Sequence, residues 1–285
     1  MSRIVVGVDG SASADRALRW AVREGELRNA EIELLYGYTL RVHAVIAGMS
    51  DRDLAEARMD EIVERNRVVL DRVKWGATLV PLLGAPTGAL LDVGGDAELI
   101  VVGSRGLEGF KELYLGSTSY RTAAHASVPV AVIRGAEETA LLDGTRPIVV
   151  GVDGSRTGQR ALRWALDEAG RREVNLTIVH AYYAPSKPSR SVLSPQDVEL
   201  LRQRAHADAV ALVDRALNDV KIHAKVNVER VVAAGSPAGV LLSRAGADRL
   251  LVVGTRGYGM LSRTLFGSVS HQLLHHADGP VVVVP

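Results

Sequence analysis

Residues 4–21 read IVVGVDGSASADRALRWA, an apolar, β-branched run that ends in Asp and Gly and leads into a helical pattern. The run itself is typical of a strand that is buried on both faces. Beyond it, apolar residues recur at the i, i+3, i+4, i+7, i+8 spacing of a helix packed on a sheet: Ala14, Ala17, Leu18, Ala21 and Val22. Ser11 or Ser13 can cap that helix. The stretch therefore predicts the first strand and helix of an α/β sheet.

The same stretch returns at residues 148–165 as IVVGVDGSRTGQRALRWA, with fourteen of its eighteen positions identical. Later blocks of the two halves also pair, which indicates a duplicated domain rather than a short-period repeat. A chain of 285 residues is long enough for two domains with a core each. The predicted domains are 1–134 and 147–285, joined by a linker at 135–146.

Strands and helices alternate through each copy. In the first copy, further strands are predicted at 31–38, 77–84, 98–103 and 129–133, and helices at 51–74, 87–94 and 117–125. This alternation favours right-handed βαβ units and an open, twisted parallel sheet with helices on both faces, a Rossmann-like α/β fold. In such sheets, ligands bind beyond the carboxyl ends of the strands, where the winding direction reverses.

The composition argues against several classes of partner. Lys plus Arg is 34 and Asp plus Glu is 33, so no charge excess predicts binding to nucleic acid or to an anionic membrane. The absence of cysteine excludes disulfides and thiolate metal sites. The start MSRIVVGVDGS lacks the order of a signal peptide, and no apolar stretch approaches ~20 residues. We therefore expect a cytoplasmic protein.

A second repeated element, VVGSRGLEGFKELYLGST at 101–118 and VVGTRGYGMLSRTLFGSV at 252–269, carries glycines at identical spacing. These are Gly103, Gly106 and Gly116 in the first copy, and Gly254, Gly257 and Gly267 in the second. The first two of each set let backbone amides approach a ligand. The third, with the serine after it, opens a helix whose free amides favour an anion. Hydroxyl donors can come from Ser117, Ser119, Ser268 and Ser270.

The spacing predicts a cradle for a triphosphate in each copy, but it leaves one alternative open. Glycines at strand ends are often ordinary turn residues, and a duplication would copy a turn as faithfully as a binding loop.

Taken together, the GVDGS segment, the glycine spacing and the closing PV(A/V)V(I/V) strand resemble the universal stress protein family in its tandem form. The resemblance covers nearly the whole chain and includes the pattern of the ATP-binding branch. It implies a five-stranded parallel sheet per domain in the order 3-2-1-4-5. It also implies that the fifth strands pair, which would make the two domains an internal pseudo-dimer, with a homodimer of whole chains left open.

The family's function implies an ATP-binding regulatory or sensor protein of the stress response, with a protein partner that the sequence does not identify and slow or no hydrolysis. By the same resemblance, Asp9 and Asp153 lie near ribose or phosphates and help to hold Mg²⁺, while Gly37 and Ala181 offer backbone groups to adenine. The residues predicted to bind nucleotide are Val8, Asp9, Gly10, Ser11, Gly37, Gly103, Arg105, Gly106, Gly116, Ser117, Thr118, Ser119, Val152, Asp153, Gly154, Ser155, Ala181, Gly254, Arg256, Gly257, Gly267, Ser268, Val269 and Ser270.

Other interpretations of these residues stay open. Asp9 and Asp153 can instead lead a helix and complement its dipole, and Arg105 and Arg256 can simply be solvated. An alternative function is a Mg²⁺-dependent ATP hydrolase or transferase, although the sequence has no GxxxxGK(S/T) loop and no evident base. Another alternative is a protein that binds cyclic AMP or a related adenylate.

Two further features carry expectations. Glu108 and Glu112 of the first glycine loop correspond to Gly259 and Arg263 of the second, which predicts tighter ATP binding by the second domain. His271 and His275 have the i, i+4 spacing of a metal pair, but no third ligand accompanies them, so a metal site is disfavoured.

Overall fold

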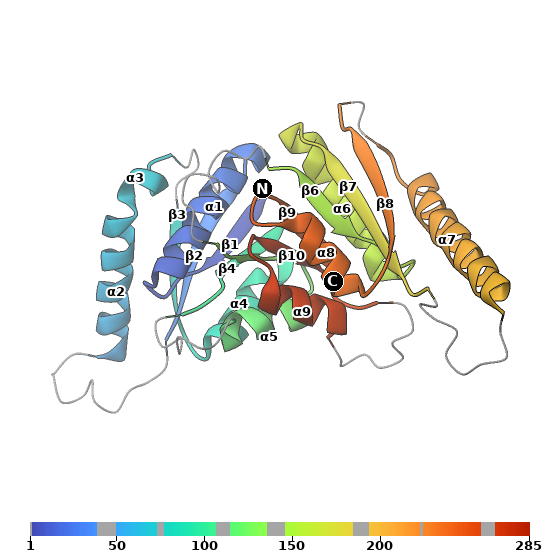
Figure 1. The fold of residues 1–285 in the computed structure, drawn as a ribbon. Helices are drawn as coiled ribbons and strands as arrows, with labels where there is room; N and C mark the ends of the chain where they lie inside the picture. Colours follow the sequence, from blue (N-terminus) through green and yellow to red (C-terminus); the bar gives the residue numbers. More distant parts are fainter. Residues whose placement is uncertain are drawn as a thin grey trace. The chain divides into compact units, whose positions relative to one another are not determined.

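The structure is a computed structural model, and it describes residues 2–38, 50–72, 77–106, 115–135, 146–184, 194–222, 225–257 and 266–285. The chain divides into two compact units (Figure 1). The first unit comprises residues 1–144 with 278–283 and 285, and the second comprises 145–277 with 284.

The first unit contains a parallel sheet in the order β3-β2-β1-β4-β5. Its strands are β1 (Arg3–Gly7), β2 (Glu31–Tyr38), β3 (Ala77–Leu83), β4 (Leu99–Gly103) and β5 (Val130–Ile133). Its helices are α1 (Ala12–Arg28), α2 (Asp51–Arg65), α3 (Arg67–Leu70), α4 (Pro86–Val93) and α5 (Ser117–His125), with a short 3₁₀ turn at Gly94–Asp96. Strand β10 (Val281–Val284) adds an antiparallel neighbour to β5, which is why residues 278–283 cluster with this unit.

The second unit repeats the pattern. Its parallel strands are β6 (Ile148–Gly151), β7 (Leu176–Tyr182), β8 (Val228–Ala234) and β9 (Leu250–Gly254), in the order β8-β7-β6-β9. Its helices are α6 (Arg156–Arg172), α7 (Pro195–Asn218), α8 (Pro237–Ala245) and α9 (Ser268–His276). Beside the end of β9, the amide of Thr255 donates to the carbonyl of Val284, as the amide of Ser104 does to that of Ile133 in the first unit.

Helices cover both faces of each sheet. In the first unit, α1 contacts α3 on one face, while α4 contacts α5 on the other (Figure 1). The winding therefore reverses between β1 and β4, and correspondingly between β6 and β9. This confirms the predicted α/β fold. None of the helices in the described part of the chain has the length and apolarity that a membrane span requires.

The predicted stripe of the first helix forms part of the core. Ala17, Leu18 and Ala21 of α1 are completely buried against the sheet, and every residue of β4 is buried. A run buried on both faces is what a central parallel strand requires.

The helix expected at 51–74 is interrupted. The structure has α2 and α3 in its place, separated at Asn66. The side-chain amide of Asn66 donates to the carbonyl of Ile62 at 2.9 Å and to Oδ1 of Asp15 at 3.0 Å. Side-chain hydrogen bonds of this kind compete with the helical backbone pattern, so the helix breaks where Asn66 binds α1.

Helices α1 and α6 end at the same backbone conformation. Asn29 (φ 53°) and Glu173 (φ 54°) adopt the left-handed region that terminates a helix. Asparagine is suited to this region, whereas glutamate is not.

A buried ion pair recurs near the end of α1 and α6. Arg28 Nε lies 3.2 Å from Glu24 Oε2, and Arg172 Nε lies 2.6 Å from Glu168 Oε1. All four side chains are at most 2% exposed. Such charges are tolerated only while both partners are present.

We expect Glu168→Ala to lower the free energy of unfolding by about 3–5 kcal/mol, because the change leaves the Arg172 guanidinium buried without its closest carboxylate. The control is Glu199→Ala, which breaks the exposed pair with Arg202 in α7 and should cost less than about 1 kcal/mol. Denaturant unfolding of both variants tests this, and similar losses for the two would contradict it.

Candidate functional site

Two loops meet at the point where the winding of each sheet reverses. In the first unit these are residues 9–11 after β1 and 104–106 after β4, which we call the first loop pair. In the second unit they are residues 153–155 and 255–257, the second loop pair. Since ligands of open α/β sheets bind at this position, the loop pairs are the candidate sites.

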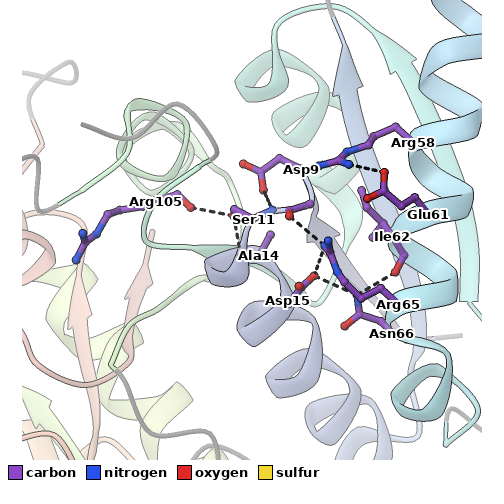
Figure 2. A network of polar contacts seen from close by, with 11 residues as sticks. Asp9, Ser11, Ala14, Asp15, Arg58, Glu61, Ile62, Arg65, Asn66 and Arg105 are labelled. Atoms are coloured by element: carbon purple, nitrogen blue, oxygen red, sulfur yellow. Dashed lines mark hydrogen bonds and ion pairs between the residues drawn. The ribbon is translucent and has the colours of Figure 1, made fainter. Parts of the chain in front are cut away.

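Hydroxyl groups hold the two loops of each pair together. Ser11 Oγ donates to the carbonyl of Arg105 at 3.3 Å (Figure 2). The amide of Arg105 in turn donates to Ser13 Oγ at 3.3 Å. In the second unit, Thr157 Oγ1 donates to the carbonyl of Arg256 at 2.5 Å, and Ser155 Oγ lies 3.4 Å from the same oxygen. The structure thus brings the predicted residues of both loops together in each copy.

The carboxylates of Asp9 and Asp153 lie inside the loop pairs. Oδ1 of Asp9 accepts the amide of Ser11 at 2.8 Å, and Oδ1 of Asp153 accepts that of Ser155 at 3.0 Å. The residue that caps the following helix is the serine and not the aspartate in both units. The aspartates therefore do not cap these helices, and the alternative in which they complement the helix dipole stays open.

The second glycine of each set lies against this carboxylate. A Cβ on Gly106 would be 2.7 Å from Asp9 Oδ2, and one on Gly257 would be 2.8 Å from Asp153 Oδ2. A side chain at either position would have to displace this carboxylate, so glycine lets the loop after β4 or β9 lie against the aspartate.

The first glycine of each set is explained by packing. A Cβ on Gly103 would lie 2.7 Å from the backbone of Ser13, and one on Gly254 would lie 2.8 Å from the backbone of Thr157. The first turns of α1 and α6 rest directly on these strand ends. Gly37 has a packing reason too, because its Cβ would be 2.6 Å from Cα of Pro86.

Gly116 differs, since neither its backbone conformation nor packing against the described residues requires a glycine there. Its Cβ would meet the nearest atoms, in Ser104 and Arg105, only at 3.5 Å and 3.6 Å, which are ordinary contacts. Its φ of −74° suits any residue. What a Cβ would fill is the space in front of the first turn of α5. Gly267 is tighter, with a Cβ 3.0 Å from the carbonyl of Thr255.

The helices that follow these glycines begin without a side-chain cap. Helices α1, α2, α6, α7 and α8 each begin at a serine whose hydroxyl accepts a backbone amide. Helices α5 and α9 begin at Gly116 and Gly267, and no side chain caps either in the described residues. Their first turns, Ser117 to Ser119 and Ser268 to Ser270, present amides that suit an anion.

Two of the expected hydroxyl donors are committed elsewhere. Ser119 Oγ donates to the carbonyl of Gly103, and Ser270 Oγ donates to that of Gly254, both at 2.6 Å and both buried. Each hydroxyl proton is thereby used to anchor the helix to the strand end. Only the main-chain amides of these two serines are left to serve a ligand, whereas Ser117 and Ser268 are exposed.

The remaining predicted residues border the loop pairs. Val8 and Val152 are buried and donate their amides to the carbonyls of Leu35 and Val179. Ala181 lies half-buried near the end of β7. Thr118 and Val269 are the second residues of α5 and α9. In addition, Nδ1 of His180 lies 2.7 Å from the carbonyl of Val152, a contact without a counterpart in the prediction.

Three arginine side chains lie near the first loop pair. The guanidinium of Arg105 points away from Asp9 and Ser11, and its backbone carbonyl faces Ser11 (Figure 2). Arg134, which follows β5, is only 8% exposed. Burial lowers the pKa of Arg134, the nearby Arg105 lowers it further, and Asp278 opposes both. Arg65 of α2 donates to the carbonyl of Gly10 at 3.0 Å.

Sequence reasoning missed Arg58 and Arg65, which contact the first loop pair from α2 (Figure 2). Their i, i+7 spacing places both on one face of the helix, and this was the available signal.

The centres of the glycine loops, with Glu108, Glu112, Gly259 and Arg263, lie outside the described residues. The rings of His271 and His275 lie 4.5 Å apart, and the described residues contain no group of three metal-ligating side chains.

Comparisons with known proteins match both copies of the repeat. A family model described as the universal stress protein family matches residues 1–134 and 144–285. A universal stress protein of Mycolicibacterium smegmatis is 33% identical over 289 residues, which cover 99% of this chain and 96% of that protein. One of Mycobacterium tuberculosis is 31% identical over 291 residues, covering 98% and 95%. The crystal structure of a universal stress protein from Archaeoglobus fulgidus shares the fold, with a TM-score of 0.64 at 20% identity over 99% of this chain and 97% of that one.

Glycines that serve packing should behave differently from Gly116 on substitution. We expect Gly103→Ala to destabilise the protein by about 1–3 kcal/mol, because the new methyl group overlaps the backbone of Ser13. Gly116→Ala should leave the free energy of unfolding within about 0.5 kcal/mol of the wild type. Thermal and denaturant unfolding without added ligand checks both, and an equal loss for the two would refute the distinction.

Proposed function

Because the chain belongs to the universal stress protein family, we propose that it binds an adenine nucleotide, ATP in the first place, at the loop pair of each unit. The observation that carries the proposal is the start of α5. A helix without a side-chain cap begins at a glycine that packing against the described residues does not require, and this glycine adjoins Ser104 and Arg105 of the loop that lies against Asp9. The start of α9 repeats most of this arrangement.

The proposed binding mode uses main-chain groups for the phosphates. The amides of the first turns of α5 and α9 attract negative charge. Gly37 and Ala181, at the ends of β2 and β7, would offer backbone groups to the base. Asp9 and Asp153 would face the ribose or the phosphates. A single carboxylate with phosphate oxygens is a usual environment for Mg²⁺, so Asp9 or Asp153 fits a nucleotide-bound Mg²⁺, which would neutralise phosphate charge.

We further propose that the protein works as a regulatory or sensor module of the stress response. Bound nucleotide can change the population of loop arrangements only through unequal affinity for them. The loops are joined by neutral hydroxyl contacts, each of which contributes about 1 kcal/mol, so a charged ligand can shift their balance. The cytoplasmic location, the protein partner, the linker at 135–146 and the internal pseudo-dimer stay predictions.

Hydrolysis is a second candidate function that the described site favours less. The guanidinium of Arg105 points away from Asp9, so it does not face the carboxylate that would hold Mg²⁺ (Figure 2). No lysine occurs among residues 8–11, 103–106, 152–155 or 254–257. Turnover with ATP and Mg²⁺ well below ~1 s⁻¹ would agree with a binding protein, and rates of ~1 to 10³ s⁻¹ would indicate an enzyme.

The test of binding is calorimetry of the full chain with ATP, ADP, AMP and cyclic AMP, together with mass spectrometry of any nucleotide that co-purifies. We expect ATP to bind, and Gly116→Ala with Gly267→Ala to weaken it at least about tenfold, since each methyl group enters the space before an uncapped helix. The control is Gly88→Ala in α4, where a Cβ meets no atom within 4 Å. Unchanged ATP affinity in the double variant would overturn the proposed site, and preference for cyclic AMP would favour that alternative.

A further inference from the structure

The two loop pairs differ in the side chain that lies over the glycine after the aspartate. In the first unit, a Cβ on Gly10 would overlap Nη2 of Arg58, so the guanidinium lies directly against this glycine. Figure 2 shows Arg58 reaching from α2 toward the loop that carries Asp9 and Ser11. In the second unit, the corresponding position on Gly154 is 3.3 Å from Cδ1 of Leu212. A cation in one copy is thus replaced by an apolar group in the other.

Arg58 belongs to a helix that is anchored to the loop after β1. Arg58 pairs with Glu61 one turn further along α2, and its side chain is 29% exposed. From the same helix, Arg65 donates to the carbonyl of Gly10 and to Oδ1 of Asp15, each at 3.0 Å. These contacts fix α2 against the loop after β1. A guanidinium held in position loses less conformational freedom when it binds an anion.

A second difference between the two units also places a positive charge in the first. Ile133 and Val284 accept equivalent amides, from Ser104 and Thr255, and are therefore matching residues of the two copies. The residue that follows is Arg134 in the first unit and Pro285 in the second. At this position the first copy has a buried cation, whereas the second copy has a proline.

We propose that Arg58 makes the first loop pair selective for the polyphosphate tail of its nucleotide, and that Leu212 leaves the second loop pair less dependent on phosphate. This rests on the proposed nucleotide binding. A guanidinium beside the aspartate loop can donate to a phosphoryl oxygen with the strength of a charge-assisted hydrogen bond. Leucine at the matching position offers contact but no charge. Arg58 favours the phosphates of a nucleotide at the first site, whereas the charges of Glu108 and Arg263 were expected to favour ATP at the second. The two effects therefore oppose each other.

The experiment compares ATP with adenosine, which lacks phosphate. Gly267→Ala weakens ATP at the second site, so that ATP binding then reports the first, and Gly116→Ala does the opposite. Adenosine does not reach these two glycines, so its affinity is compared in each background with and without the change at residue 58 or 212. In the first background, Arg58→Leu should weaken ATP about tenfold and adenosine less than about threefold, while Arg58→Lys should retain most ATP affinity. In the second background, Leu212→Arg should strengthen ATP more than adenosine.

A matched control is Arg52→Leu, which removes an exposed charge from the same helix and should change neither affinity. Unfolding of each variant without ligand shows that it folds, and Arg58→Gln replaces Arg58→Leu if the latter does not. Equal effects on ATP and adenosine, no effect on either, or the same effect from Arg52→Leu would overturn the proposal. If the wild type binds neither ligand, this proposal and the proposed function both fail.

Discussion

The close approach of the first turn of α1 to the end of β4 is the contact on which the candidate site depends. Ser13 rests on Gly103 so closely that a methyl group would not fit, and Thr157 rests on Gly254 in the same way. This contact brings the loop after the first strand onto the loop after the fourth strand. The serine and threonine hydroxyls can then join the two loops. Without it, the aspartate and the second glycine of each unit would not meet.

This contact also separates two roles that look alike in the sequence. Gly103 and Gly116 belong to one spaced motif, yet the former allows the helix to pack and the latter leaves space before an uncapped helix. The alternative that these are ordinary structural glycines is correct for Gly103 and Gly254. It does not account for Gly116. A motif can therefore combine residues that build the scaffold with residues that leave room for a ligand.

Much of the fold followed from the sequence because the repeat and the strand pattern are strong local signals. The helix at 117–125 was predicted correctly from that pattern, and the strand order 3-2-1-4-5, which the family resemblance implied, is confirmed in the first unit. The break at Asn66 was missed, since it depends on a hydrogen bond to Asp15 in another helix. The buried Glu24–Arg28 pair resembles an exposed i, i+4 pair in sequence, and only the tertiary packing buries it. Arg58 was missed for the same reason, because charges on an amphipathic helix usually face water.

The residue that ends α6 has the same left-handed backbone conformation as the residue that ends α1. Asn29 and Glu173 hold nearly the same dihedral angle, although this region costs a residue such as glutamate about 1–2 kcal/mol. The amides of Ala30 and Val174, just beyond, both return to the preceding helix, so the following strand starts from the same place in both copies. The corner thus has the same geometry in both copies, although only one copy has the residue suited to it. In this duplicated chain, the backbone conformation here agrees between the copies where the side chains differ.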